Sequence, residues 1–183
     1  MKKDRFEAFT DAVIAIILTI LVLEIRLPTN NHSLSALIDI APQFFAYIFS
    51  FILISTMWVN HHNLFMQVKT INNQTLWLNI ILLFWSSLLP STTAWIGTSL
   101  MSPVPAVSCA LNVTLYNLSF GMLRENVIKY NKIIKARRKL ERVSFLINII
   151  SLLGTFFWSP LVFIGLIINV LLWSLPHIFT NNN

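Results

Sequence analysis

The chain has 183 residues, of which 56% are hydrophobic and only 11% are charged, and its formal net charge is +6 at pH 7. Apolar residues spread over nearly the whole length are typical of a polytopic membrane protein. The single cysteine, Cys109, excludes a disulfide framework and a cysteine metal site within one chain. We therefore expect an all-α membrane protein in which residues 1–183 form one unit of transmembrane helices.

Six apolar segments approach the length of about 20 residues that a helix needs to cross a bilayer. They cover residues 8–25, 40–60, 76–96, 106–123, 143–158 and 160–179. The first begins with an acidic residue, lacks a small-x-small cleavage site and leads into further spans, so we expect it to stay in the mature protein. Pro90 is expected to kink the third span. The tight joint Trp158-Ser159-Pro160 predicts that the fifth and sixth spans form a helical hairpin.

Lysine and arginine residues are distributed unevenly between the two ends of these spans. With the N-terminus in the cytoplasm, 12 of the 13 are cytoplasmic and only Arg26 lies outside. The positive-inside rule therefore predicts six spans with the N- and C-termini both cytoplasmic. The basic run from Lys132 to Arg142 could also bind RNA or anionic lipid. Because the topology already explains this run, we expect the bilayer and no nucleic acid as a partner.

The first span carries a stripe of residues that share one helical face: Ala12, Ile16, Thr19 and Leu23, with Ile20 beside them. Such a stripe is common in helix packing. Thr19, however, places a hydroxyl at mid-membrane, and Arg5, Thr10 and Asp11 form a polar mouth below it. A mostly hydrophobic path between charged mouths fits a narrow pore that closes by dewetting.

The second span ends in a polar cluster, Trp58-Val59-Asn60-His61-His62, at the membrane level where the first span begins. Adjacent histidines point about 100° apart on a helix, so a metal site that uses both is disfavoured. One of them can face Asp11 or Thr10 as a structural hydrogen bond, a proton relay or a pH sensor. We favour the structural bond, because polar groups in lipid must be satisfied internally, and we predict that Asp11 pairs directly with His61 or His62.

These segments resemble a known family, the transmembrane protein 175 potassium channels. The first-helix signature is matched by Arg5-x-x-x-Phe9-Thr10-Asp11, then Ala15-Ile16, Thr19 and Leu23-Glu24. The second and third helices are matched by Trp58-x-x-His61-His62-x-x-Phe65 and by Leu76-x-x-Asn79 with Leu89-Pro90. Thr10 stands where Ser is commoner, which keeps the hydroxyl. A single set of six spans resembles the prokaryotic members, which are homotetramers with the first helix lining the pore.

The resemblance implies a potassium-permeable, weakly selective leak-type channel in the cell membrane of a prokaryote. By position, Ile16 would be the main hydrophobic constriction, Thr19 a hydroxyl layer, and Ile20 and Leu23 the outer layers. The residues that would instead be structural, cross-linked near the cytoplasmic end, are Arg5, Phe9, Thr10, Asp11, His61, His62 and Asn79. No Thr-Val-Gly-Tyr-Gly carbonyl filter is present. Potassium would pass transiently, with no fixed metal and no cofactor.

Two other classes of function compete with a channel. An enzyme built on His61 and His62 is disfavoured, because the chain offers no nucleophile-base-acid set, zinc spacing or Gly-rich phosphate loop. A proton-coupled transporter that uses Asp11 and His61 remains the alternative. Transporters of that kind usually show inverted repeats and helices broken at mid-membrane, whereas the Gly and Pro residues here cluster near span ends.

Overall fold

The computed structural model describes residues 2–131 and 138–179, and the described residues are helical apart from the joints between helices. The helices are α1 (Lys3–Leu23), α2 (Leu34–Asp39), α3 (Ala41–Met66), α4 (Asn73–Ser87), α5 (Leu89–Thr98), α6 (Pro103–Asn131), α7 (Arg138–Gly154) and α8 (Leu161–Phe179). The predicted all-α class is confirmed. Among the described residues, four stretches are long and apolar enough to cross a membrane: α1, α3, α4 together with α5, and α6. The helix α8 matches the sixth predicted span, whereas α7 overlaps the fifth, 143–158, but begins five residues and ends four residues earlier.

The third predicted span is divided into two helices at Leu88, which ends α4 and precedes α5. Pro90 lies in the first turn of α5, where its missing N–H costs least and its fixed φ suits the start of a helix. The third span is thus interrupted two residues before the proline at which a kink was expected. At its other end α4 begins at a capping residue, because the Asn72 side chain accepts a hydrogen bond from the Thr75 backbone N–H at 2.7 Å.

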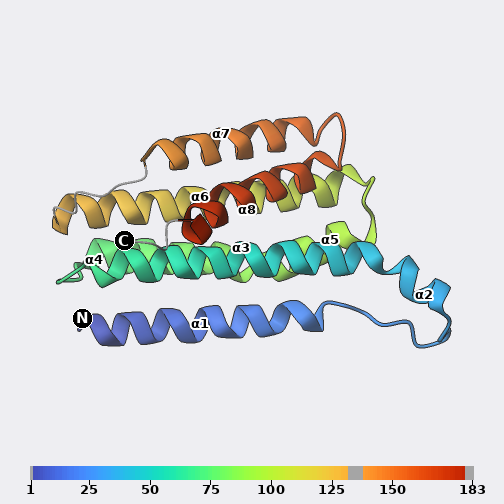
Figure 1. Cartoon of the computed structure of the whole chain (residues 1–183), viewed down its shortest axis with the longest axis horizontal. Helices are drawn as coiled ribbons and strands as arrows, with labels where there is room; N and C mark the ends of the chain where they lie inside the picture. The colour runs from blue at the N-terminus through green and yellow to red at the C-terminus, as the bar shows by residue number, and fades with distance from the viewer. Residues whose placement is uncertain (1, 132–137, 180–183) are drawn as a thin grey trace.

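The long helices run side by side, with α1 at one edge of the bundle and α7 at the opposite edge (Figure 1). The start of α1, the end of α3, the start of α4 and the end of α6 share one end of the molecule. The short α2 and the loop before it extend beyond the other end. The helix α1 packs against α3, α4 and α5. One side of α1 therefore remains without a helix against it.

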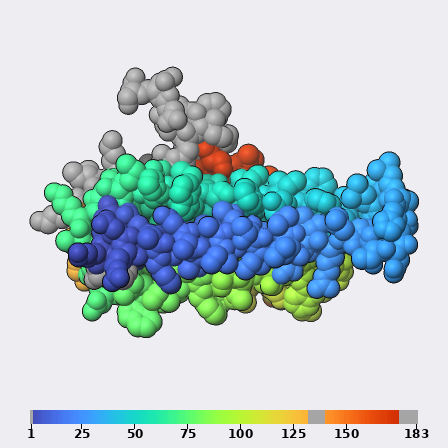
Figure 2. Space-filling view, turned by 90° about the horizontal axis from the view of Figure 1, so that it is seen from below, coloured from blue at the N-terminus to red at the C-terminus, as the bar shows by residue number. Residues whose placement is uncertain are grey.

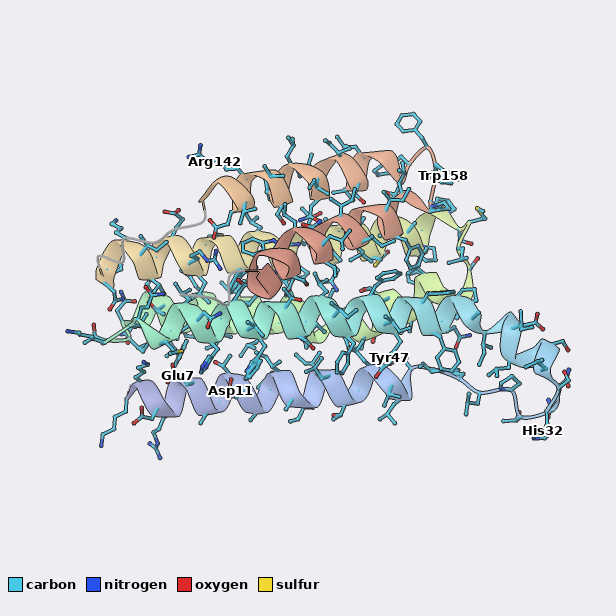
Figure 3. All side chains as sticks on the ribbon, in the orientation of Figure 1. Glu7, Asp11, His32, Tyr47, Arg142 and Trp158 are labelled. Atoms are coloured by element: carbon cyan, nitrogen blue, oxygen red, sulfur yellow. The ribbon has the colours of Figure 1, made fainter. Side chains whose placement is uncertain are left out.

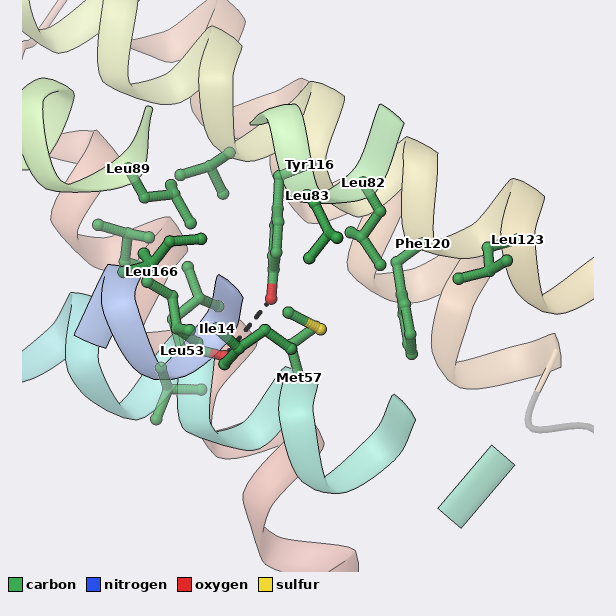
Figure 4. Packing of buried hydrophobic residues seen from close by; sticks show 14 of the residues in the cluster. Ile14, Leu53, Met57, Leu82, Leu83, Leu89, Tyr116, Phe120, Leu123 and Leu166 are labelled. Carbon is green, nitrogen blue, oxygen red and sulfur yellow. Dashed lines mark hydrogen bonds between the residues drawn. The ribbon is translucent and has the colours of Figure 1, made fainter. Parts of the chain in front are cut away.

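The core is an apolar cluster to which α1, α3, α4, α6 and α8 all contribute. Figure 4 shows Ile14 of α1 beside Leu53 and Met57 of α3, with the Tyr116 ring of α6 reaching the same layer. The Tyr116 hydroxyl donates to the Leu53 carbonyl oxygen at 3.5 Å. Close van der Waals packing within this cluster holds the inner side of α1 against the bundle.

The α7–α8 hairpin predicted from the joint at 158–160 is confirmed, and small residues allow its close packing. A Cβ atom built on Gly165 would lie 2.5 Å from Ser151 Oγ and 2.7 Å from Ser151 Cβ. Ser151 also donates to the Leu161 carbonyl oxygen at 3.1 Å. Close backbone approach at small residues is a principal way in which helices associate in membranes, where apolar burial drives association little.

We predict that Gly165→Ala lowers the stability of the protein by about 1–3 kcal/mol, because the added methyl group overlaps Ser151. The measurement is the thermal unfolding midpoint of the purified protein in detergent. Gly121→Ala is the matched control, since a Cβ on Gly121 meets nothing within 4 Å. Alanine is the better helix former, so this control should unfold at the same temperature or slightly higher. Equal destabilisation by the two changes would contradict the assignment.

Candidate functional site

The helix α1 has two different faces. Its buried residues are Phe6, Thr10, Ile14, Ile17 and Leu21. The opposite face is exposed and carries the stripe singled out in the sequence, with Ile16 57%, Ile20 40% and Leu23 76% exposed. Figure 2 shows α1 lying along the surface of the molecule. The candidate pore-lining residues are thus together on the one side of α1 that the bundle leaves open.

Thr19 lies on this open face and points its hydroxyl hydrogen back to the helix. Its Oγ1 donates to the Ile16 carbonyl oxygen at 2.8 Å. This back-bonding is common for threonine inside helices and occupies the only hydrogen of the hydroxyl group. The lone pairs of the exposed oxygen remain available. Such an oxygen presents negative partial charge, which suits a passing cation.

The inner face of α1 is fixed by a buried chain of hydrogen bonds across three helices. Asn79 of α4 donates from Nδ2 to Thr10 Oγ1 at 2.8 Å, and its Oδ1 lies 3.0 Å from His61 Nε2 of α3. Thr10 Oγ1 donates in turn to the Phe6 carbonyl oxygen at 3.0 Å. An amide oxygen can only accept, so His61 carries its hydrogen on Nε2. Thr10, Asn79 and His61 are each at most 2% exposed.

Aromatic rings enclose this chain of hydrogen bonds. The His61 ring stacks on Phe65 with centroids 4.4 Å apart, and Phe6 stacks on His61 at 6.1 Å. Phe6 and Phe65 contact each other at 4.8 Å. Phe6 was not among the site residues predicted from the sequence. The sequence did indicate that Phe6 lies on the same face of the helix as Thr10, because the two residues are one turn apart.

The predicted direct pairing of Asp11 with a histidine is wrong. Asp11 Oδ1 instead accepts a hydrogen bond from Trp58 Nε1 at 2.8 Å, and His62 stacks on the Trp58 ring at 5.8 Å. Figure 3 shows Asp11 on the side of α1 that faces α3. Successive residues of a helix point about 100° apart, so Thr10 and Asp11 diverge, as do His61 and His62. Two separate contacts therefore replace the single unit that we expected.

Arg5 and Phe9 lie outside both contacts. Each is exposed on α1, with Phe9 50% exposed. Within residues 2–131 and 138–179, neither side chain forms a hydrogen bond or an ion pair. Their predicted structural role therefore gains no support from contacts within one subunit. In the same described ranges, no group of three His, Cys, Asp or Glu side chains is arranged to hold a metal ion.

Comparisons with known proteins agree on one family. Residues 5–90 match the family described as "Endosomal/lysosomal potassium channel TMEM175". A potassium channel of Chryseobacterium sp. is 40% identical over 96% of this chain and 94% of its own length. A potassium channel of Chamaesiphon minutus is 33% identical over 61% of this chain and 58% of its own. The crystal structure of a lysosomal potassium-selective channel TMEM175 homologue from Chamaesiphon minutus superposes with a TM-score of 0.80 at 26% identity, covering 95% and 97% of the two chains.

We predict that Asn79→Leu destabilises the protein by about 1–3 kcal/mol, because it leaves buried Thr10 and His61 without a hydrogen-bond partner. The double variant Asn79→Leu/His61→Leu should lose less stability than the sum of the losses in the two single variants, since the two residues are coupled. Thermal unfolding of the solubilised protein, followed by size-exclusion chromatography, measures both effects. The control is Asp11→Asn, which keeps an oxygen that can accept from Trp58. Full additivity of Asn79→Leu and His61→Leu would rule out the coupling.

Proposed function

Since this chain belongs to the TMEM175 family of potassium channels, a family of ion channels and not of enzymes, we propose that it is a potassium-permeable, weakly selective leak-type channel. Four copies would assemble with α1 of each subunit around a central pore. The observation that carries this proposal is the open face of α1, where Ile16, Thr19, Ile20 and Leu23 are exposed together. The protein would act in the cell membrane of a prokaryote.

The chemistry of that face supports a pore better than a surface in contact with lipid. Arg5 is in helical register with Ile16 and Leu23, and exposed Asp11 lies at the edge of the same face. Charged groups in contact with hydrocarbon are costly, whereas a water-filled path lined by several subunits solvates them. Thr19 adds a hydroxyl oxygen within the span, where acyl chains provide no hydrogen-bond donor for it.

We infer six membrane spans, formed by α1, α3, α4 with α5, α6, α7 and α8, with both termini in the cytoplasm. In support, the helix ends next to Lys3, Lys69 and Lys129 share one end of the bundle, while Arg26 follows the other end of α1 (Figure 1). The positive-inside rule assigns the basic end to the cytoplasm. Residues 132–137, which hold part of the basic run, lie outside the described residues.

Permeation in this arrangement depends on how easily an ion gives up water. Ile16 would form the narrowest ring, and Ile20 and Leu23 would form apolar rings above it. Hydrophobic constrictions of this kind close by dewetting. The four Thr19 oxygens would replace part of the water around the ion, and a few hydroxyls discriminate between cations less sharply than a carbonyl cage does. The channel should therefore prefer potassium only modestly.

The alternative, a proton-coupled transporter, needs Asp11 and His61 to exchange a proton. The contacts favour the channel over this mechanism, because Asp11 is bonded to Trp58 and His61 to Asn79. An indole N–H does not release its proton under physiological conditions, so it breaks such a relay. Purified protein in liposomes distinguishes the two functions. A channel releases potassium down its gradient at a rate independent of an imposed proton gradient, and coupling of the two would favour the transporter.

We predict that Ile16→Ala raises potassium flux severalfold, because a smaller side chain widens and wets the narrowest ring. Flux is measured as potassium efflux from liposomes with equal protein content. Ile150→Ala is the matched control, since Ile150 is 62% exposed on α7 at the opposite edge of the bundle. The control should conduct like the parent protein. Unchanged flux in Ile16→Ala would place the constriction at another residue.

We predict that Thr19→Val reduces the preference for potassium over sodium without changing assembly, because it removes the oxygen but keeps the side-chain shape. The preference is read from the reversal potential in planar bilayers with potassium on one side and sodium on the other. For Thr19→Val this potential should move toward zero. Thr98→Val is the control, because Thr98 is exposed and back-bonded in the same way, to the Trp95 carbonyl oxygen at 2.7 Å. An unaltered potential in Thr19→Val would exclude a role for the hydroxyl in selectivity.

A further inference from the structure

A cavity of about 370 Å³ lies between α6, α7 and α8, away from α1 and the proposed pore. Its apolar lining includes Leu118 and Met122 of α6, Phe145 of α7 and Trp173 of α8. The volume falls in the range of pockets that hold small organic ligands, about 300–1,000 Å³. The cavity lies toward the end of the bundle at which α1 begins, because α6 ends and α7 begins there (Figure 1).

Gly121 keeps this cavity open. It lies in the interior of α6, where glycine is a poorer helix former than alanine. A Cβ atom built on Gly121 meets nothing within 4 Å, although residues on both sides of it line the cavity. Any larger side chain at this position would project into the open space and reduce it.

The wall behind the cavity is polar and held in place by several contacts. Arg124 forms an ion pair with Glu141 at 2.8 Å, with both side chains largely buried. The Arg124 guanidinium also lies over the rings of Phe120 and Trp173, at 4.9 and 5.1 Å. Trp173 donates from Nε1 to Ser144 Oγ at 3.2 Å. The cavity therefore has its shape before any ligand enters, which lowers the cost of binding.

One exposed cation lies at the rim of the cavity. Arg142 lines it from α7, is exposed, and forms no ion pair with the residues that the structure describes. In Figure 3 its side chain projects outward from α7. Glu125 also lies at the rim. The sequence from Arg124 to Arg142 holds eight Lys and Arg residues against two Glu, and residues 132–137 of that segment lie outside the described residues. Basic clusters next to a membrane span attract anionic lipids.

We propose that this cavity is a binding site for an anionic phospholipid. The phosphate would pair with Arg142, and one acyl chain would enter between α6 and α7 and fill the space over Gly121. An apolar, preformed cavity facing the bilayer with a cation at its rim matches both parts of such a molecule. The site is independent of the proposed pore, so it can be tested without measuring conduction.

The first experiment measures lipid binding to the delipidated, detergent-solubilised protein by native mass spectrometry, with phosphatidylglycerol and phosphatidylcholine of the same acyl chains. Phosphatidylglycerol should bind more tightly. Gly121→Leu, which fills the cavity, should abolish this binding, while Gly121→Ala should retain it. In Arg142→Gln the preference for phosphatidylglycerol over phosphatidylcholine should fall about fivefold, as expected for the loss of one cation near an anionic headgroup. The control is Arg26→Gln at the other end of α1, which should bind like the parent protein.

The second experiment reads the site in the unmodified protein, in case Gly121→Leu folds poorly. Phosphatidylglycerol with a brominated acyl chain should quench Trp173 fluorescence, because Trp173 lines the cavity. Quenching should therefore be smaller in Trp173→Phe, which keeps an aromatic ring over Arg124. Equal quenching of the two proteins, equal binding of the two lipids by the parent, or unchanged binding by a folded Gly121→Leu would each overturn the proposal.

Discussion

The buried hydrogen bonds from Thr10 through Asn79 to His61 are the interaction on which the arrangement of this chain depends. They join α1, α4 and α3 at one level of the bundle and are enclosed by Phe6 and Phe65. In a bilayer no water competes for these groups, so each polar group must find its partner within the protein. The three side chains therefore fix both the height and the rotation of α1. Apolar packing alone would leave the rotation poorly defined.

Rotation decides which side chains α1 leaves open. With Thr10 turned inward, Ile14, Ile17 and Leu21 follow it into the core, and the stripe through Ile16 and Leu23 faces outward. Asp11 lies between the two faces and is held by Trp58. Structure and proposed permeation thus use different residues of one helix: the inner face carries stability, and the outer face would carry the ions. This separation lets each face be changed without directly disturbing the other.

In α6, α7 and α8, on the side of the bundle away from α1, small residues determine the packing. Gly165 and Ser151 bring α7 and α8 into close contact, whereas Gly121 of α6 faces open space. The buried Arg124–Glu141 pair and the Trp173 ring, which lies against Arg124, form the wall behind the cavity. A buried ion pair adds little net stability once desolvation is counted, but it penalises arrangements that would leave either charge unpaired. The result is a preformed cavity at the edge that faces away from the proposed pore.

Composition and periodicity were sufficient to predict the all-α membrane class, the approximate positions of the long helices and the α7–α8 hairpin, because these depend on local hydropathy and backbone chemistry. The short helix α2 and the exact helix ends were not predicted. The same reasoning grouped Ile16, Thr19 and Leu23 on one face. The hydrogen-bond partners of the polar residues could not be predicted in this way. Sequence spacing placed Asp11 and His61 at one level but could not show that Trp58 would take Asp11 and that Asn79 would take His61. The position of Phe6 one turn before Thr10 indicated its face but not its contacts with His61 and Phe65, and the cavity over Gly121 had no signal in the sequence. Those outcomes depend on the rotation of each helix against its neighbours, which only the packing of the whole bundle decides.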